Sequence, residues 1–345
     1  MEQRFLSTYQ TVQEGAIMKS KNIIIAFVIV LLLAGGVMAW RQGLEDTHEE
    51  NGVSVVFISK NKPENNEFWS SIEEGVQMAV ADYNIDITIM RPDSEIDTST
   101  QNEMILSAIA MKPEAIVLVP SNYITTLPYA KQIEEAGIKL ILLDSVMQED
   151  IGVSVVTTNN YEGGYKMGEY LKYYADEDTY IGIIGHIKEA STAIERERGV
   201  RDGLEEYADR IVSLVYCDSD AEIGRMLTLE LLAEHPYINM LVGLNEDSAR
   251  GAAKAIEEMG MGNEIRLIGF DNSMEQIRLL EAGVFDAIVV QKPLNMGYLG
   301  IQVAYQAVKN EKIPESVDSG SVLITRNNLY TKENEKLLFP FREEN

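Results

Sequence analysis

The sequence has one cysteine, Cys217, and only three histidines among its 345 residues. A single cysteine cannot form an intrachain disulfide, and it excludes paired-cysteine zinc or redox motifs. The histidines, at positions 48, 186 and 235, show no metal-ligand spacing. We therefore expect a fold that depends on its hydrophobic core and that uses no metal and no cofactor.

Positive charge is also scarce. Lys and Arg number 29 against 55 Asp and Glu, so the formal net charge is −26. A field of this sign repels phosphate backbones and anionic lipid surfaces, which excludes nucleic acid as a partner. A transcription repressor is further disfavoured, because an apolar segment stands where a basic helix-turn-helix would be.

That apolar segment, residues 23–39, contains no charged residue, and Lys19 and Lys21 precede it. It is near the lower length limit for a membrane-spanning helix and slightly long for the core of a signal peptide. Both interpretations place the chain after Arg41 outside the cytoplasmic membrane and residues 1–22 on the cytoplasmic side. We favour a retained anchor over a cleaved signal.

Two features of the amino-terminal region leave alternatives open. Met18 opens a better basic segment than Met1 does, so it is an alternative start. Residues 37–39 resemble a weak cleavage site. Residues 40–51 are acidic and polar without periodicity, and we expect them to form a tether.

From residue 52 onward, short apolar runs alternate with amphipathic stretches. The runs have strand length and are rich in β-branched residues: VSVVFIS, IDITIM, AIVLV, LILL, VSVV, YIGIIG, IVSLVY, NMLVG, IRLIG and AIVV. Between them, apolar residues recur at helical spacing, as over residues 68–83 and 249–259. Gly137 and Gly260 stand where helices commonly end. This alternation predicts parallel sheets with helices on both faces.

There are too many strands for one comfortable sheet, so we predict two doubly wound lobes with a cleft between them. The N-terminal lobe is expected over residues 52–157 and 292–320, and the C-terminal lobe over residues 158–291 and 321–332. Residues 333–345 are expected to form a tail. The chain then crosses between the lobes three times, near residues 157–160, after Gln291, and near residues 320–321.

Several predicted strands end in a planar polar side chain. Asp144, Asn245, Asp271 and Gln291 each follow a strand, and the first strand leads to Asn66, Phe68 and Trp69. Ligands of open parallel sheets bind beyond the carboxyl ends of the strands. Planar polar groups engage sugar hydroxyls, and aromatic rings stack on sugar C–H faces. The alternative for each Asp or Asn is a helix N-cap.

These motifs resemble those of the periplasmic sugar-binding proteins of the ribose-binding type, relatives of the lactose-repressor ligand domain. The resemblance covers residues 53–329, and the matching motifs are NNEFW, LLDS, RERG, LNED, GFDN and VVQKP. It implies a three-crossover, hinge-bending type I periplasmic binding protein. It also implies ligand contacts by Asn66, Phe68, Trp69, Asp144, Arg196, Asn245, Asp271 and Gln291.

The sequence departs from the family pattern at three places. Ser145 replaces an arginine, Glu67 replaces a proline, and the segment AEIGR offers only Ile223 where an aromatic residue often stands. Because an arginine and a stacking ring are lost, the identity of the sugar stays open. Arg198 and Arg201 are expected to lie on a solvated face.

We therefore predict a solute-binding protein that captures a monosaccharide or related polyol for an ABC importer. The alternative is a membrane-tethered sensor that presents such a ligand to a histidine kinase or chemoreceptor. An enzyme is disfavoured, because no Walker A motif and no complete GxGxxG follows a strand. The sequence GGYKMG from Gly163 lacks the required spacing.

Overall fold

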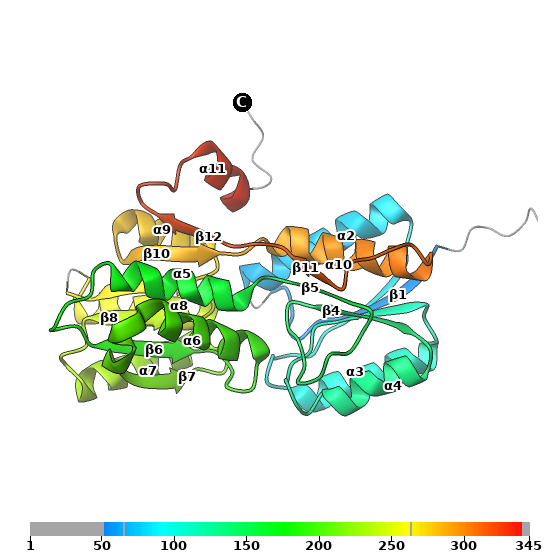
Figure 1. The fold of residues 1–345 in the computed structure, drawn as a ribbon, viewed down its shortest axis with the longest axis horizontal. Coiled ribbons are helices and arrows are strands. Elements are labelled where there is room, and N and C mark those ends of the chain that lie inside the picture. Colours follow the sequence, from blue (N-terminus) through cyan, green and yellow to red (C-terminus); the bar gives the residue numbers. More distant parts are fainter. Residues whose placement is uncertain (1–51, 65, 263, 340–345) are drawn as a thin grey trace, which may run out of the picture. The chain divides into compact units, whose positions relative to one another are not determined.

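The computed structural model describes residues 52–64, 66–262 and 264–339, and these form two α/β lobes (Figure 1). The expected amino-terminal segments, residues 1–22, 23–39 and 40–51, lie outside the described residues. Within the described ranges, no helix is both long and apolar enough to span a membrane.

The first lobe is built on a parallel six-stranded sheet, as far as the chain is described, in the order β11-β5-β4-β3-β1-β2. Its strands are β1 (Ser54–Ile58), β2 (Asp86–Met90), β3 (Ala115–Leu118), β4 (Lys139–Leu143), β5 (Ser154–Thr157) and β11 (Ser316–Asp318). Its helices are α2 (Glu67–Tyr83), α3 (Thr98–Met111), α4 (Leu127–Glu135) and α10 (Pro293–Val308). Helices α2 and α10 pack on one face, and α3 and α4 on the other.

The second lobe repeats this strand order as β12-β10-β9-β8-β6-β7, with only β12 antiparallel to its neighbour among the described strands. Its strands are β6 (Ile181–Gly185), β7 (Ile211–Tyr216), β8 (Met240–Gly243), β9 (Arg266–Phe270), β10 (Phe285–Val290) and β12 (Val322–Thr325). Its helices are α5 (Asn160–Lys172), α6 (Ser191–Leu204), α7 (Ala221–Glu234), α8 (Glu246–Met259), α9 (Met274–Ala282) and α11 (Lys332–Leu338), with the 3₁₀ helix η1 (Glu205–Arg210).

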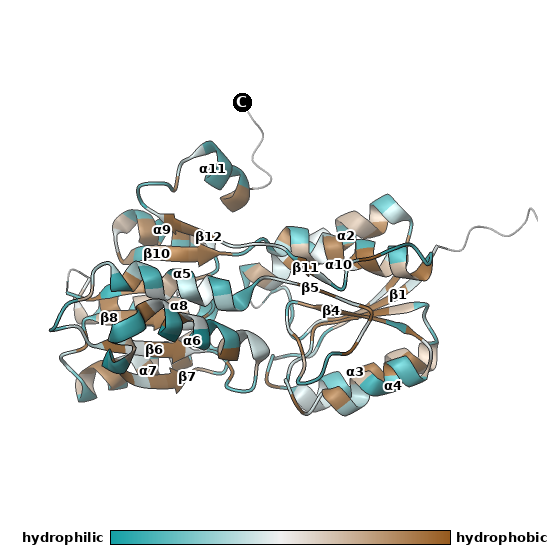
Figure 2. Cartoon of the chain, in the orientation of Figure 1, coloured by the Kyte–Doolittle hydropathy of each residue, from teal (hydrophilic) through white to brown (hydrophobic). Residues whose placement is uncertain are grey.

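The predicted architecture of two doubly wound parallel-sheet lobes is confirmed. The ten apolar runs coincide with β1 to β10, and the strands are mostly apolar while the helices carry one apolar and one polar face (Figure 2). The chain passes between the lobes from β5 to α5, from β10 to α10, and from β11 to β12. We did not predict β11 and β12, which have three and four residues.

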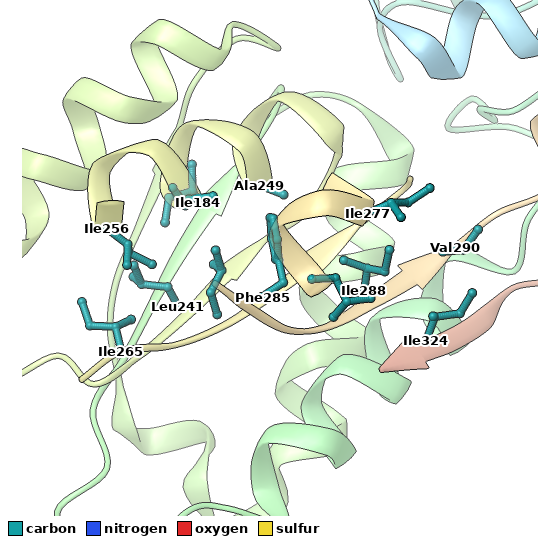
Figure 3. Packing of buried hydrophobic residues seen from close by; sticks show 14 of the residues in the cluster. Ile184, Leu241, Ala249, Ile256, Ile265, Ile277, Phe285, Ile288, Val290 and Ile324 are labelled. Atoms are coloured by element: carbon teal, nitrogen blue, oxygen red, sulfur yellow. The ribbon is translucent and has the colours of Figure 1, made fainter. Parts of the chain in front are cut away.

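In the second lobe, helices α7, α8 and α9 cover one face of the sheet and α5 and α6 cover the other. Figure 3 shows Ala249 and Ile256 of α8 facing Leu241 and Phe285 of the sheet; all four are fully buried. A close-packed core of this kind resists deformation. Each sheet therefore holds the loops at its strand ends in fixed positions.

Glycines bring paired helices into backbone contact. A Cβ atom at Gly164 on α5 or at Gly199 on α6 would lie 2.1 Å from a carbonyl oxygen of the facing helix. Gly75 on α2 and Gly297 on α10 show the same approach, at 2.0 Å. Glycines of the GGYKMG sequence therefore bring α5 into close contact with α6.

The expected tail begins with a helix. Helix α11 spans Lys332–Leu338, and Leu338 is buried against the core of the second lobe. The prediction of a tail from residue 333 is wrong up to residue 338. Three of the six residues 333–338 are charged, and only contact with α9 and the sheet core shows which side of the helix is apolar. Residues 340–345 lie outside the described part.

Candidate functional site

A hollow of about 300 Å³ lies at the carboxyl ends of the strands, between the loops of both lobes. All eight residues predicted as ligand contacts line it: Asn66, Phe68, Trp69, Asp144, Arg196, Asn245, Asp271 and Gln291. Five lining residues were not predicted: Lys60, Glu95, His186, Thr192 and Glu246.

The start of α2 supplies the aromatic side of the hollow. Asn66 is the N-cap, and its side-chain oxygen accepts a hydrogen bond from the Trp69 backbone N–H at 3.1 Å. The rings of Phe68 and Trp69 pack edge to face, with centroids 4.9 Å apart. The indole N–H of Trp69 donates to Glu95 at 2.7 Å. Both rings are therefore held in place before any ligand arrives.

The carboxylate of Asp144, after β4, is paired with a lysine. Lys60 Nζ lies 2.9 Å from Asp144 Oδ2 and 2.8 Å from Ser145 Oγ, and all three side chains are buried. Ser145 stands where the resembling family has an arginine. The structure thus places a different cation beside Asp144, and it comes from the loop after β1 rather than from the adjacent position.

Arg196 on α6 is buried at 3% exposure and held from three directions. Its Nε donates to Asn160 at 2.9 Å, and its Nη1 donates to the Leu244 carbonyl at 2.7 Å. Its guanidinium carbon lies 3.7 Å from the centroid of the Phe270 ring. Burial lowers the pKa of Arg196, while the charges of Asp271 and Asp144 oppose that shift. These contacts fix the orientation of the planar guanidinium group before a ligand binds.

Asp271 occupies the position in the second lobe that Asp144 occupies in the first. Both residues follow a strand, both have a positive φ, of 70° and 61°, and both donate their N–H to the neighbouring strand. Asp271 accepts from Gln291 Nε2 at 2.6 Å and from the Glu246 N–H at 2.9 Å. Burial raises the pKa of Asp271, and the charge of Arg196 lowers it.

The N-cap interpretation applies to Asn245 but not to Asp144. Asn245 caps α8, exchanging hydrogen bonds with Ser248 in a capping box. Asp144 precedes a loop and then β5, and α9 is capped by Ser273 rather than by Asp271. Asn245 therefore both caps a helix and lines the hollow.

Carboxylates join the two lobes beside the hollow. Glu246 at the start of α8 accepts from the N–H of Phe68 at 3.2 Å, and Asp247 accepts from Asn66 Nδ2 at 3.1 Å. In the opposite direction, Glu67 of α2 accepts from the N–H of Met274 at the start of α9, at 3.0 Å. These hydrogen bonds join the start of α2 in the first lobe to the starts of α8 and α9 in the second.

Burial also changes the acidity of these carboxyls. Burial, together with the charges of Asp247 and Asp271, raises the pKa of Glu246 to about 8. Burial and the charge of Glu95 raise the pKa of Asp247 to about 7. Closure of the lobes thus brings the carboxyls into surroundings that favour their protonated forms.

Three of the unpredicted lining residues lie just after strands, a position from which the sequence could have indicated them. His186 follows β6, Lys60 lies in the loop after β1, and Glu246 begins α8 shortly after β8. Glu95 and Thr192 carried no such signal: Glu95 lies in the connection between β2 and α3, and Thr192 lies in the first turn of α6. Ile223, the residue in place of a second aromatic ring, packs against the core of the second lobe instead. Among the described residues, no group of His, Cys, Asp and Glu could hold a metal ion.

Comparison with known families gives one match, described as a periplasmic binding protein domain, over residues 55–312. The chain is 27% identical over 265 residues to the D-ribose/D-allose-binding protein of Pseudomonas aeruginosa, covering 74% of this chain and 83% of that protein.

Solved structures show the same relationship. A sugar transporter from Clostridium phytofermentans is 40% identical, with a TM-score of 0.75, covering 79% of this chain and 99% of that one. A carbohydrate transporter solute-binding protein from Agrobacterium radiobacter, in complex with D-arabinose, is 27% identical, with a TM-score of 0.77, covering 83% and 99%. The compact unit of residues 52–345 therefore corresponds to nearly the whole of these proteins.

Proposed function

Because the chain belongs to the periplasmic binding protein family, we propose that it is an extracytoplasmic solute-binding protein that captures a monosaccharide or related polyol. The observation that carries this proposal is the hollow between the lobes, where all eight predicted contact residues meet. Four of them come from each lobe or its crossover. Neither lobe alone can therefore enclose a ligand.

The chemistry of the hollow favours a hydroxylated, uncharged ligand. A hydroxyl both donates and accepts hydrogen bonds, so it can use Arg196 as a donor and Asp144 and Asp271 as acceptors. Phe68 and Trp69 offer ring surfaces to the C–H face of a sugar. The buried carboxylates repel a second anion, so sugar acids and sugar phosphates are disfavoured.

We propose an ABC permease as the partner, since relatives with this fold are described as sugar transporters. The uncharged segment 23–39 is the observation that favours a tethered receptor instead. The two partners are distinguished by uptake. A strain lacking this chain loses import of the bound sugar if the partner is a permease, and keeps import but loses the response to the sugar if the partner is a receptor.

The ligand class is tested by thermal unfolding of residues 52–345 with pentoses, hexoses, deoxysugars, polyols and amino acids. A ligand at 100 times its Kd adds about 2.7 kcal/mol to the free energy of unfolding, which raises Tm. We expect a rise with one or more neutral sugars. A rise only with amino acids or peptides would overturn the proposal. Recovery of the sugar chemically unchanged, by mass spectrometry, separates binding from enzymatic conversion.

A further inference from the structure

His186 directly follows β6 and lines the hollow, where no ligand contact was predicted for it. Its side chain is 2% exposed. On one side, its Nε2 lies 2.8 Å from Thr192 Oγ1. On the other side, its Nδ1 is buried and has no hydrogen-bond partner. A neutral imidazole has one donor and one acceptor nitrogen, so half of this capacity is unused.

The imidazole is neutral in these surroundings. Burial lowers the pKa of His186 well below its ordinary value, and the positive charges of Arg196 and Lys60 lower it further. An uncharged ring offers one directed hydrogen bond and no ion pair. It therefore suits a polar group such as a hydroxyl and gives a carboxylate or a phosphate no positive charge to pair with.

A second unpaired atom lies in the same hollow. Gln291 donates its amide hydrogen to Asp271 at 2.6 Å, but its side-chain oxygen is buried without a partner. Leaving buried polar atoms unpaired costs free energy, and such atoms occur at sites where a further group binds. Both side chains belong to strand ends of the second lobe, β6 and β10.

We propose that His186 is a specificity-determining contact, whose Nδ1 forms a hydrogen bond with one hydroxyl of the bound sugar. The inference rests on the proposed function and deepens it, because it requires an uncharged hydroxyl at one position of the ligand. A deoxy analogue that lacks this hydroxyl leaves Nδ1 unpaired and binds more weakly. Thr192 orients the ring through its contact with Nε2.

The test uses His186→Phe, which keeps a ring of similar shape and removes both nitrogens. Calorimetry on residues 52–345 compares D-ribose, D-allose, D-arabinose and their single-deoxy analogues. We expect the variant to bind the best of these sugars roughly tenfold more weakly, the effect of one lost hydrogen bond. One deoxy analogue should bind the variant and the unchanged protein equally. His235→Phe, outside the hollow, is the control and should bind all sugars as the unchanged protein does.

A spectroscopic measurement on the unchanged protein does not depend on the variant folding. Residues 52–345 contain only two histidines, so their ring nitrogens are assigned with His235→Phe. We expect the ¹⁵N resonance of His186 Nδ1 to move when the sugar saturates the protein. An unmoved resonance, or equal losses for every deoxy analogue in His186→Phe, would overturn the inference. If no sugar binds the unchanged protein, the proposed function itself fails.

Discussion

At the scale of single residues, Asp271 combines a strained backbone with a buried charge. Its φ of 70° lies in the left-handed region, which Asn and Asp tolerate better than most residues. Its carboxylate is held by Gln291 and by the N–H of Glu246, so its position is set before ligand arrives. This arrangement allows the charge to be removed without changing the backbone.

Asp271→Asn is therefore expected to weaken sugar binding by about ten- to a hundredfold, because a hydrogen bond to a charged group contributes roughly 1.5–3 kcal/mol. Asn offers one acceptor oxygen where the carboxylate offers two, so one of the hydrogen bonds from Gln291 and Glu246 is lost and the melting temperature without ligand should also fall. The matched control is Asp218→Asn, since Asp218 also has a positive φ, of 52°, but is exposed. Equal losses in the two variants, measured by calorimetry, would show that the effect is one of backbone strain.

At the scale of elements, the contact of α5 with α6 positions Arg196. The two helices meet through glycines, and α6 carries Arg196 on its buried side, against Phe270. A side chain inserted at this contact must move one helix. The ligand site is therefore sensitive to a substitution at Gly199, which does not line the hollow.

Gly199→Ala is expected to lower the free energy of unfolding by about 1–3 kcal/mol, as overpacking commonly does. It should also weaken sugar binding, because the displacement of α6 moves Arg196. The control is Gly262→Ala, at which an added Cβ meets nothing within 4 Å. Urea unfolding and calorimetry measure the two effects. A destabilised Gly199→Ala variant with unchanged affinity would show that Arg196 moves independently of the helix contact.

The carboxyls at the start of α8 are expected to make sugar affinity depend on pH. Glu246 faces Asp247, Asp271, Arg250 and the N–H of Phe68. Asp247 faces Glu95, Asn66 and Arg250 as well. In an open cleft we expect these carboxyls to face water, which moves their pKa values back toward the ordinary range. In the closed form the pKa of Glu246 is about 8 and that of Asp247 is about 7, so the protein binds protons when the lobes close.

Because protonated carboxyls favour the closed form, sugar affinity is expected to be highest near pH 5, to fall as pH rises, and to level off above pH 8. One proton taken up corresponds to about tenfold in affinity for each pH unit. Glu246→Gln keeps an acceptor oxygen for the Phe68 N–H and removes the titration. It should flatten the pH profile and bind more tightly than the unchanged protein at pH 8.

Glu257→Gln is the matched control, since Glu257 is exposed on the same helix. It should leave the profile unchanged. A pH profile of Glu246→Gln that coincides with that of the unchanged protein would show that Glu246 does not titrate on closure.

At the scale of the whole molecule, binding and closure are coupled. Hydrogen bonds between the lobes join Tyr123 to Glu189 and Val146 to Ser191, besides those of the carboxylates. The lobes are connected by three short crossings, which can absorb a hinge rotation while each sheet stays rigid. Closing an empty hollow buries polar atoms such as His186 Nδ1 without partners, which disfavours the closed form without ligand.

Small-angle scattering of residues 52–345 should therefore show a smaller radius of gyration with saturating sugar than without it. The sugar selects the closed form through its additional contacts with the second lobe. Saturation is established first by calorimetry on the same sample. A scattering profile that does not change at saturation would contradict hinge closure while leaving the fold unaffected.

Much of the site was predictable because parallel strands carry their carboxyl ends to one edge of a sheet. Asp144, Asn245, Asp271 and Gln291 could thus be brought together from their places after apolar runs, without knowledge of any contact. The presence of two lobes was predicted from the number of strands, which is too large for one sheet. Alternation and helical spacing report burial along one element, and this information is local.

Which groups meet across elements depends on how the elements pack together. Lys60 pairs with Asp144, 84 positions away, and Glu246 contacts the N–H of Phe68, 178 positions away. The packing of α11 and the unpaired nitrogen of His186 were likewise absent from any pattern. The sequence pattern predicts strands β1 to β10, the two lobes, the acidic charge and the residues at the strand ends. The pairings inside the hollow depend on how far each helix is rotated and shifted against its neighbours, which no local periodicity encodes.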